Sequence, residues 1–132
     1  MGQMIELKCE KCGYDVRLNI GAGMSYTSLE KVIGFFDKSD RVLIEAAIKN
    51  NPKSFWYVSQ EIGICERCGK ISAIAVFRLT TDDGINIEYQ AKCPCGGDVD
   101  LEDSEKVLEG KNVIKCPVCK EPFTATVTGH WD

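Results

Sequence analysis

What this sequence lacks narrows its class before any motif is considered. No run of apolar residues approaches the roughly 20 that span a bilayer, and the chain begins without the basic flank and apolar stretch of a signal peptide. Glu6 stands where a myristoylation signal has Ser or Thr. We therefore expect a cytoplasmic protein with no membrane partner.

A cluster of basic side chains is also absent. The 132 residues include 16 Lys and Arg against 20 Asp and Glu, which gives a net charge of −4. The stretch 98–109 alone holds six carboxylates and one lysine. Binding to a phosphate backbone needs clustered Lys and Arg that release counterions. The composition therefore disfavours nucleic-acid binding, which we keep as an alternative function.

Signals of an enzyme are sparse. The only histidine, His130, is interpreted as a surface residue near the chain end. Gly21-Ala22-Gly23 precedes a predicted helix without the third glycine of a dinucleotide-binding fingerprint, so we interpret it as a strand-to-helix turn. The aromatic run 55–57 is interpreted as core packing, because no basic cluster surrounds it to make a platform for nucleobases. No residue is assigned a catalytic role, and we interpret the protein as non-enzymatic.

Cysteine, in contrast, is abundant: eight residues occur in four close pairs. In a reducing cytosol this number points to metal binding rather than to disulfides. Two cysteines at this spacing in a tight turn can direct both sulfurs at one ion about 2.3 Å away. The pairs are Cys9/Cys12, Cys65/Cys68, Cys93/Cys95 and Cys116/Cys119.

Four such pairs make two complete tetrahedral sites with no ligand left over. We therefore predict two bound zinc ions, each held by four thiolates, with iron as the alternative because such sites accept either metal. Gly follows directly after Cys12 and Cys68, whereas Lys120 stands in the corresponding place after Cys119. The pair Cys93/Cys95 departs from the others, because a single residue separates its cysteines, and Gly96-Gly97 follows it. Lys11 and Arg67, inside two of the pairs, are interpreted as offsetting thiolate charge.

Which pairs share an ion is open to two interpretations. The sequential one, which we favour, joins Cys9, Cys12, Cys65 and Cys68 in one site and Cys93, Cys95, Cys116 and Cys119 in the other. It divides the chain into an N-terminal zinc-ribbon lobe, 1–92, and a C-terminal one, 93–132. The alternative joins the two middle pairs across the hairpin 71–91 and leaves the outer pairs to meet. It requires the two ends of the chain to close over everything between them.

Hydrophobic periodicity predicts a mainly β fold, of the small α+β kind, with a helical insertion at about 27–51. Thr27-Ser28-Leu29-Glu30 has the form of a capping box at the start of one helix, and Ser39 or Asp40 can cap a second. Extended segments precede each cysteine pair. We expect strands at 14–20, 54–64, 71–79, 85–91 and 123–127, and a weak one through Val99 and Leu101.

With these motifs placed, the chain resembles a group of uncharacterised bacterial zinc-ribbon proteins. The shared features are Cys9-x-x-Cys12-Gly13-Tyr14, the loop Gly21-Ala22-Gly23-Met24-Ser25-Tyr26 and the ending Gly129-His130-Trp131-Asp132. The resemblance implies a fold with two metal ions and no particular activity. More distantly, the cysteine knuckles are similar to those of rubredoxin, where the same ligands hold iron for electron transfer.

These observations lead to one functional hypothesis and two alternatives. We expect a non-enzymatic adaptor in which structural zinc ribbons present a surface to a protein partner, whose identity the sequence does not reveal. One alternative is a nucleic-acid-binding zinc ribbon of transcription or translation. The other is a rubredoxin-like iron electron carrier.

Overall fold

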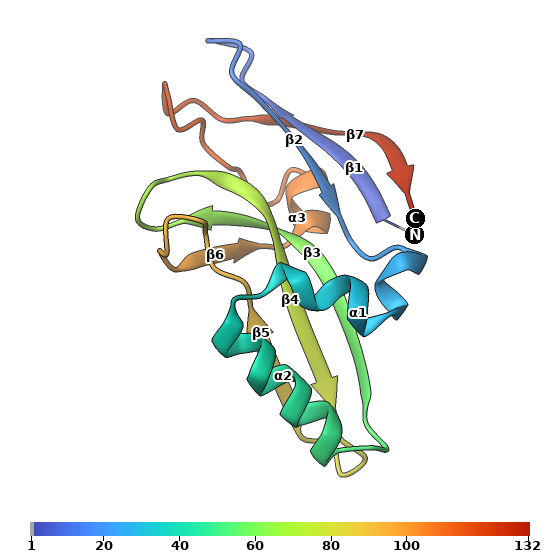
Figure 1. The fold of residues 1–132 in the computed structure, drawn as a ribbon. Coiled ribbons are helices and arrows are strands. Elements are labelled where there is room, and N and C mark those ends of the chain that lie inside the picture. Colours follow the sequence, from blue (N-terminus) through green and yellow to red (C-terminus); the bar gives the residue numbers. More distant parts are fainter. Residues whose placement is uncertain (1) are drawn as a thin grey trace.

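A computed structural model describes residues 2–132, without the side chains of residues 24 and 25. Two antiparallel sheets dominate it, and a short helical region packs beside one of them (Figure 1). The mainly β fold with a helical insertion, predicted from the sequence, is confirmed. The first sheet has the order β2-β1-β7, and its strands are β1 (Gly2–Lys8), β2 (Asp15–Ile20) and β7 (Thr124–Trp131). The second has the order β5-β4-β3-β6, and its strands are β3 (Phe55–Cys65), β4 (Ile71–Thr80), β5 (Asn86–Gln90) and β6 (Val99–Glu102).

The first sheet joins the two ends of the sequence. Its central strand, β1, pairs with β2 on one side and with β7 on the other, and Figure 1 shows the blue and red strands running side by side. The β1–β7 register runs from Gly2 opposite Trp131 to Lys8 opposite Thr124, with a bulge between Met4 and Ile5. Ile5 and Leu7 project from β1 into the core and have no exposed surface.

The second sheet is built on the long hairpin of β3 and β4. These strands pair over nearly their whole length, from Phe55 opposite Thr80 to Ile64 opposite Ile71. On the other edge of β3, the short strand β6 pairs only with residues 62–65. Gly21 adds one isolated bridge to Gln60 on that edge. The first half of β3 therefore has a neighbouring strand on one side only.

The helical region links β2 to β3 and packs on the second sheet (Figure 1). It consists of the 3-10 turn η1 (Met24–Thr27), α1 (Leu29–Val32), the 3-10 turn η2 (Ile33–Phe35) and α2 (Lys38–Asn50). Its caps differ from those predicted. Asp37, rather than Ser39 or Asp40, caps α2, because its carboxylate accepts the Asp40 amide at 2.8 Å. Ser28 precedes α1 but makes no side-chain capping bond. A further helix, α3 (Ser104–Leu108), follows β6 and was not predicted.

Two clusters of buried side chains form the core. One lies between the helical region and the second sheet and is centred on Phe77, Ile44 and Leu79. The other contains Ile5 and Leu7 of the first sheet together with residues from β3, β4 and α3. Each sheet takes strands from both sides of the boundary predicted between residues 92 and 93. Within residues 2–132, no helix is long and apolar enough to cross a membrane.

The indole of Trp131 fastens the end of β7 across the first sheet. Its Nε1 donates a hydrogen bond to the Ile20 carbonyl of β2 at 3.1 Å, and its ring lies 5.0 Å from that of Tyr26. To reach β2 the indole passes over Gly2 of β1, where a Cβ would lie 2.2 Å from it. Only glycine at position 2 leaves room for this crossing. Two motifs of the sequence, the loop 21–26 and the Trp131-Asp132 ending, therefore meet.

We expect Trp131→Ala to lower the free energy of unfolding by about 2 kcal/mol, since it removes a half-buried ring and a hydrogen bond. Trp131→Phe should cost about 1 kcal/mol, because it keeps a ring against Tyr26 and loses the bond to Ile20. Denaturant unfolding followed by circular dichroism measures both. His130→Ala, at the exposed neighbouring position, is the control, and an equal effect of His130→Ala and Trp131→Ala would contradict the crossing.

Candidate metal centres

The first cysteine cluster lies where the two ends of the chain meet. Cys9 directly follows β1 and Cys12 lies in the turn to β2, while Cys116 and Cys119 lie in the turn before β7. The four sulfurs all lie within 4.8 Å of one another. The Cys9 and Cys119 sulfurs are 3.3 Å apart, and those of Cys12 and Cys116 are 3.6 Å apart.

The second cluster lies at the end of the β3–β4 hairpin. Cys65 is the last residue of β3 and Cys68 lies in the turn to β4, while Cys93 and Cys95 lie between β5 and β6. These sulfurs also lie within 4.8 Å of one another. The Cys65 and Cys95 sulfurs are 3.5 Å apart, and those of Cys68 and Cys93 are 3.6 Å apart.

The sequential pairing favoured from the sequence is therefore wrong, and the alternative is what the structure contains. The outer pairs meet in one cluster and the inner pairs in the other. Strand pairing is the physical reason: β7 pairs with β1 and brings the Cys116/Cys119 turn to the Cys9/Cys12 turn. In the same way, β6 pairs with the end of β3 and brings Cys93 and Cys95 to Cys65.

Both clusters follow one arrangement. A hairpin carries one cysteine pair in its turn, and its first strand also pairs with the strand that follows the second cysteine pair. In the first cluster these strands are β2-β1-β7, and in the second they are β4-β3-β6. The second unit is nested between the two halves of the first.

The backbone of three turns has a common form. The amides of Gly13, Gly69 and Lys120 each donate to the carbonyl of the cysteine four residues earlier, at 2.9 Å in every case. All three residues have a positive φ, of 79°, 74° and 67° respectively. Within residues 2–132, Lys120 is the only residue other than glycine with a positive φ. Lys120 stands where the two other turns have glycine, and its backbone is therefore strained.

The fourth turn, Cys93-Pro94-Cys95, is one residue shorter. Gly96 donates to the Cys93 carbonyl, only three residues earlier, at 2.7 Å. Gly97 then passes close to the cluster, and its amide lies 3.4 Å from the Cys95 sulfur. A Cβ on Gly97 would lie 2.9 Å from the Cys65 sulfur. The two glycines thus allow the shortened turn to present both sulfurs.

Neighbouring amides and thiols shift the cysteine pKa values in opposite directions. The Cys12 amide is the main cause that lowers the pKa of Cys9 to about 7, and the Cys68 amide is the main cause that lowers the pKa of Cys65 to about 6. The amides of Cys95 and Glu121 act in the same direction on Cys93 and Cys119, but burial and the neighbouring thiols outweigh them and raise both pKa values to about 12. Four thiolates so close together need a cation between them.

The donor set and spacing fit a tetrahedral metal ion. Four sulfurs about 2.3 Å from a central Zn²⁺ lie about 3.8 Å from one another. The four shortest contacts, of 3.3 to 3.6 Å, are slightly less than this, and all sulfurs of a cluster lie within 4.8 Å of one another. All eight cysteines are free thiols. Cys9, Cys116, Cys65 and Cys93 are buried, so each cluster has an inner side formed by protein. Each of the two four-cysteine groups can therefore hold a metal ion.

Charged residues beside the clusters connect the facing turns. The Lys11 ammonium lies 3.2 Å from the Glu121 carboxylate across the first cluster. Arg67 donates to the Cys95 carbonyl at 3.4 Å across the second. From their place inside the cysteine pairs, Lys11 and Arg67 were expected to offset thiolate charge. Their contacts also connect the two turns of each cluster. Among the other residues considered from the sequence, His130 is exposed on β7.

Comparison with known protein families, with curated proteins and with solved structures finds no match for this chain.

We expect Lys120→Gly to raise the free energy of unfolding by about 0.5–1 kcal/mol, because glycine relieves the left-handed backbone but costs some chain entropy. Gly13→Ala is the matched opposite change: no atom lies within 4 Å of its Cβ position, so backbone strain alone should destabilise it, by about 1 kcal/mol. Denaturant unfolding in a metal-buffered solution measures both. A loss of stability in Lys120→Gly would show that the lysine side chain itself is needed there.

We expect Cys116→Ser combined with Cys119→Ser to abolish the first metal site and leave the second intact, because the clusters share no ligand. Metal-binding energy is also folding energy, so amide exchange should accelerate around Cys9 and in β7 and stay slow around Cys93. The mirrored control, Cys65→Ser with Cys68→Ser, should reverse this pattern. Exchange read by mass spectrometry that stays slow around Cys9 in the first variant would contradict the observed pairing.

Proposed function

We propose that this chain is a non-enzymatic zinc protein in which two structural zinc ions hold a surface for binding another protein. The observation that carries the proposal is the pair of closed four-thiol clusters, each joining a hairpin turn to a distant strand. A catalytic zinc keeps a coordination position open for water, whereas a site with four protein ligands is usually structural.

The free energy of zinc binding supports a structural role for the two ions. Zinc binding to a four-ligand site contributes roughly 10–16 kcal/mol in finger-sized peptides at neutral pH, as much as the stability of a whole domain. The first cluster joins Cys9 to Cys119, 110 residues apart, so its ion would also close most of the chain into a loop. Removal of such an ion would separate the two turns that it joins, at one end of the first sheet.

An exposed aromatic surface supports protein binding. Phe55 and Tyr57, on the open half of β3, have relative exposures of 69% and 41%. The prediction that the run 55–57 packs in the core therefore holds for Trp56, which stacks on Phe77 with ring centroids 5.8 Å apart, and is wrong for its two neighbours. A net charge of −4 continues to disfavour nucleic-acid binding.

We expect purified protein to carry two equivalents of zinc per chain and to unfold when a strong chelator removes them, because the metal holds the strands together. Native mass spectrometry and elemental analysis give the stoichiometry and identity of the metal. Iron, with a red colour and visible absorption, would instead support the electron-carrier alternative. A single metal per chain, or four disulfides and no metal, would contradict the proposal.

A further inference from the structure

The two four-cysteine clusters share one set of donors but differ in their access to solvent. In the second cluster, Cys68 and Cys95 are both exposed, whereas in the first only Cys12 is exposed and Cys119 is half-buried. The buried cysteines of the first cluster have no exposed surface, and those of the second keep 3% and 5% of theirs. A small solute therefore has more of the second cluster within reach.

The protein also holds the turns of the second cluster less firmly. The turns of the first are backed by the seven-residue pairing of β1 with β7, and the ion pair of Lys11 with Glu121 connects them. The turns of the second are backed by the four-residue pairing of β3 with β6, and Arg67 connects them through its bond to the Cys95 carbonyl. Because fewer paired residues hold the second cluster closed, its turns can shift against each other at a lower cost in free energy.

The sulfurs of the second cluster form two pairs that cross between its turns. The sulfur of the exposed Cys95 lies 3.5 Å from that of the buried Cys65, and the sulfur of the exposed Cys68 lies 3.6 Å from that of the buried Cys93. A disulfide has its sulfurs about 2.05 Å apart, so each pair would close by about 1.5 Å. The two pairs share no sulfur, so both of these cross-turn disulfides can form, and both would link the turns that a metal ion joins.

Thiolates that bind zinc are already deprotonated, and a thiolate is the form of cysteine that peroxide oxidises. The sulfur attacks one oxygen of hydrogen peroxide: an S–O bond forms, the O–O bond breaks, and the departing hydroxide takes a proton and leaves as water. The neighbouring thiolate then attacks the resulting sulfenic acid, so that an S–S bond forms, the S–O bond breaks, and a second hydroxide takes a proton and leaves as water. In sum, two thiolates lose two electrons, one molecule of hydrogen peroxide accepts them, and two protons are consumed.

We propose that the second cluster is a site of oxidative modification, at which hydrogen peroxide converts the four thiolates to the disulfides Cys65–Cys95 and Cys68–Cys93 and displaces the zinc ion. Whichever disulfide forms first removes two of the four ligands of the ion. The first cluster, which is less exposed and more firmly held, keeps its ion at peroxide concentrations that empty the second. The inference rests on the proposed function, because zinc-bound thiolates are the groups that react.

The first test treats the zinc-loaded protein with hydrogen peroxide and follows the release of zinc with a zinc-responsive dye. We expect native mass spectrometry to show an early product that has lost one zinc ion and four hydrogens per chain. Alkylation of the remaining thiols and peptide mapping should then locate the two cross-turn disulfides, with all four cysteines of the first cluster still reduced. A disulfide within one turn, such as Cys65–Cys68, or earlier loss of the ion from the first cluster, would overturn the inference.

The second test replaces sulfurs by histidine, which also binds zinc but forms no disulfide. Cys68→His combined with Cys95→His removes one sulfur of each cross-turn pair and should slow the loss of zinc from the second cluster at least tenfold. The matched control, Cys12→His with Cys119→His, changes the first cluster in the same way and should leave that rate unchanged. Equal rates in the two variants would contradict the inference. Zinc stoichiometry checks that both variants are loaded, and where one is not, the peptide map of the unaltered chain decides.

Reduction distinguishes this modification from oxidative damage. Dithiothreitol with added zinc should restore two zinc ions per chain and all eight free thiols, because disulfides are reversible whereas sulfinic acids are not. Permanent loss of the second site would overturn the inference. The metal stoichiometry before peroxide is added tests the proposed function separately. A chain that carries two zinc ions but forms no cross-turn disulfide leaves that function standing and removes only the oxidation site.

Discussion

Four thiols converge on one point at two places in the chain, and the rest of this structure depends on that constraint. Each cluster joins the turn of a hairpin to a turn much further along the chain: 110 residues separate Cys9 from Cys119, and 30 separate Cys65 from Cys95. Closing a loop costs chain entropy that rises slowly with its length. A metal ion held by the outer cluster would offset this loss of chain entropy. The seven-residue pairing of β1 with β7 could then form beside it.

One four-cysteine cluster and its strands are nested in the sequence between the two halves of the other. This nesting explains why the two sheets pack against each other. Ile5 and Leu7, from the outer unit, are buried in one cluster with Ile62 and Ile71, from the inner unit. The inner hairpin thus supplies part of the apolar surface against which the ends of the chain close. Neither sheet is wide enough to bury its strands alone, and each depends on the other as well as on its cysteines.

Local structure could be predicted from the sequence, whereas long-range pairing could not. The alternation of residues in β5 and the apolar run of β4 mark those strands directly, and the unusual Lys120 marked a turn whose strain the structure reveals. The cysteine pairs are chemically equivalent, so their spacing predicts metal binding but not which pairs meet. That choice depends on β7 pairing with β1 and on the four-residue β6 pairing with β3, and nothing within a single segment specifies those contacts. The cap of α2 was missed for a smaller reason: three possible capping residues, Asp37, Ser39 and Asp40, lie within four positions, and each can begin the helix.

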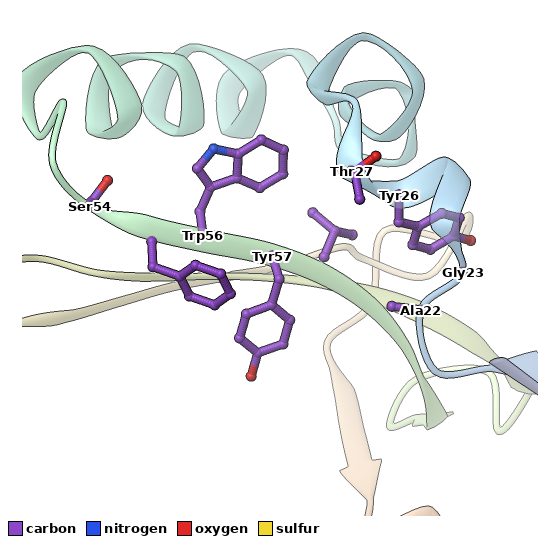
Figure 2. A pocket seen from close by; sticks show the side chains of 9 residues that line it. Ala22, Gly23, Tyr26, Thr27, Ser54, Trp56 and Tyr57 are labelled. Carbon is purple, nitrogen blue, oxygen red and sulfur yellow. The ribbon is translucent and has the colours of Figure 1, made fainter. Parts of the chain in front are cut away.

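The outer cluster and the cavity between the first half of β3 and the loop after β2 (Figure 2) are joined by contiguous contacts. The Cys116/Cys119 turn leads into β7, whose Trp131 lies 5.0 Å from Tyr26. Tyr26 lines this cavity, and its hydroxyl accepts a hydrogen bond from Gln60 of β3 at 3.2 Å. A metal ion in the outer cluster would hold the turn that leads into β7, and with it the indole that packs on Tyr26. Occupancy of a four-cysteine cluster would in this way set the shape of a cavity that none of its own ligands lines.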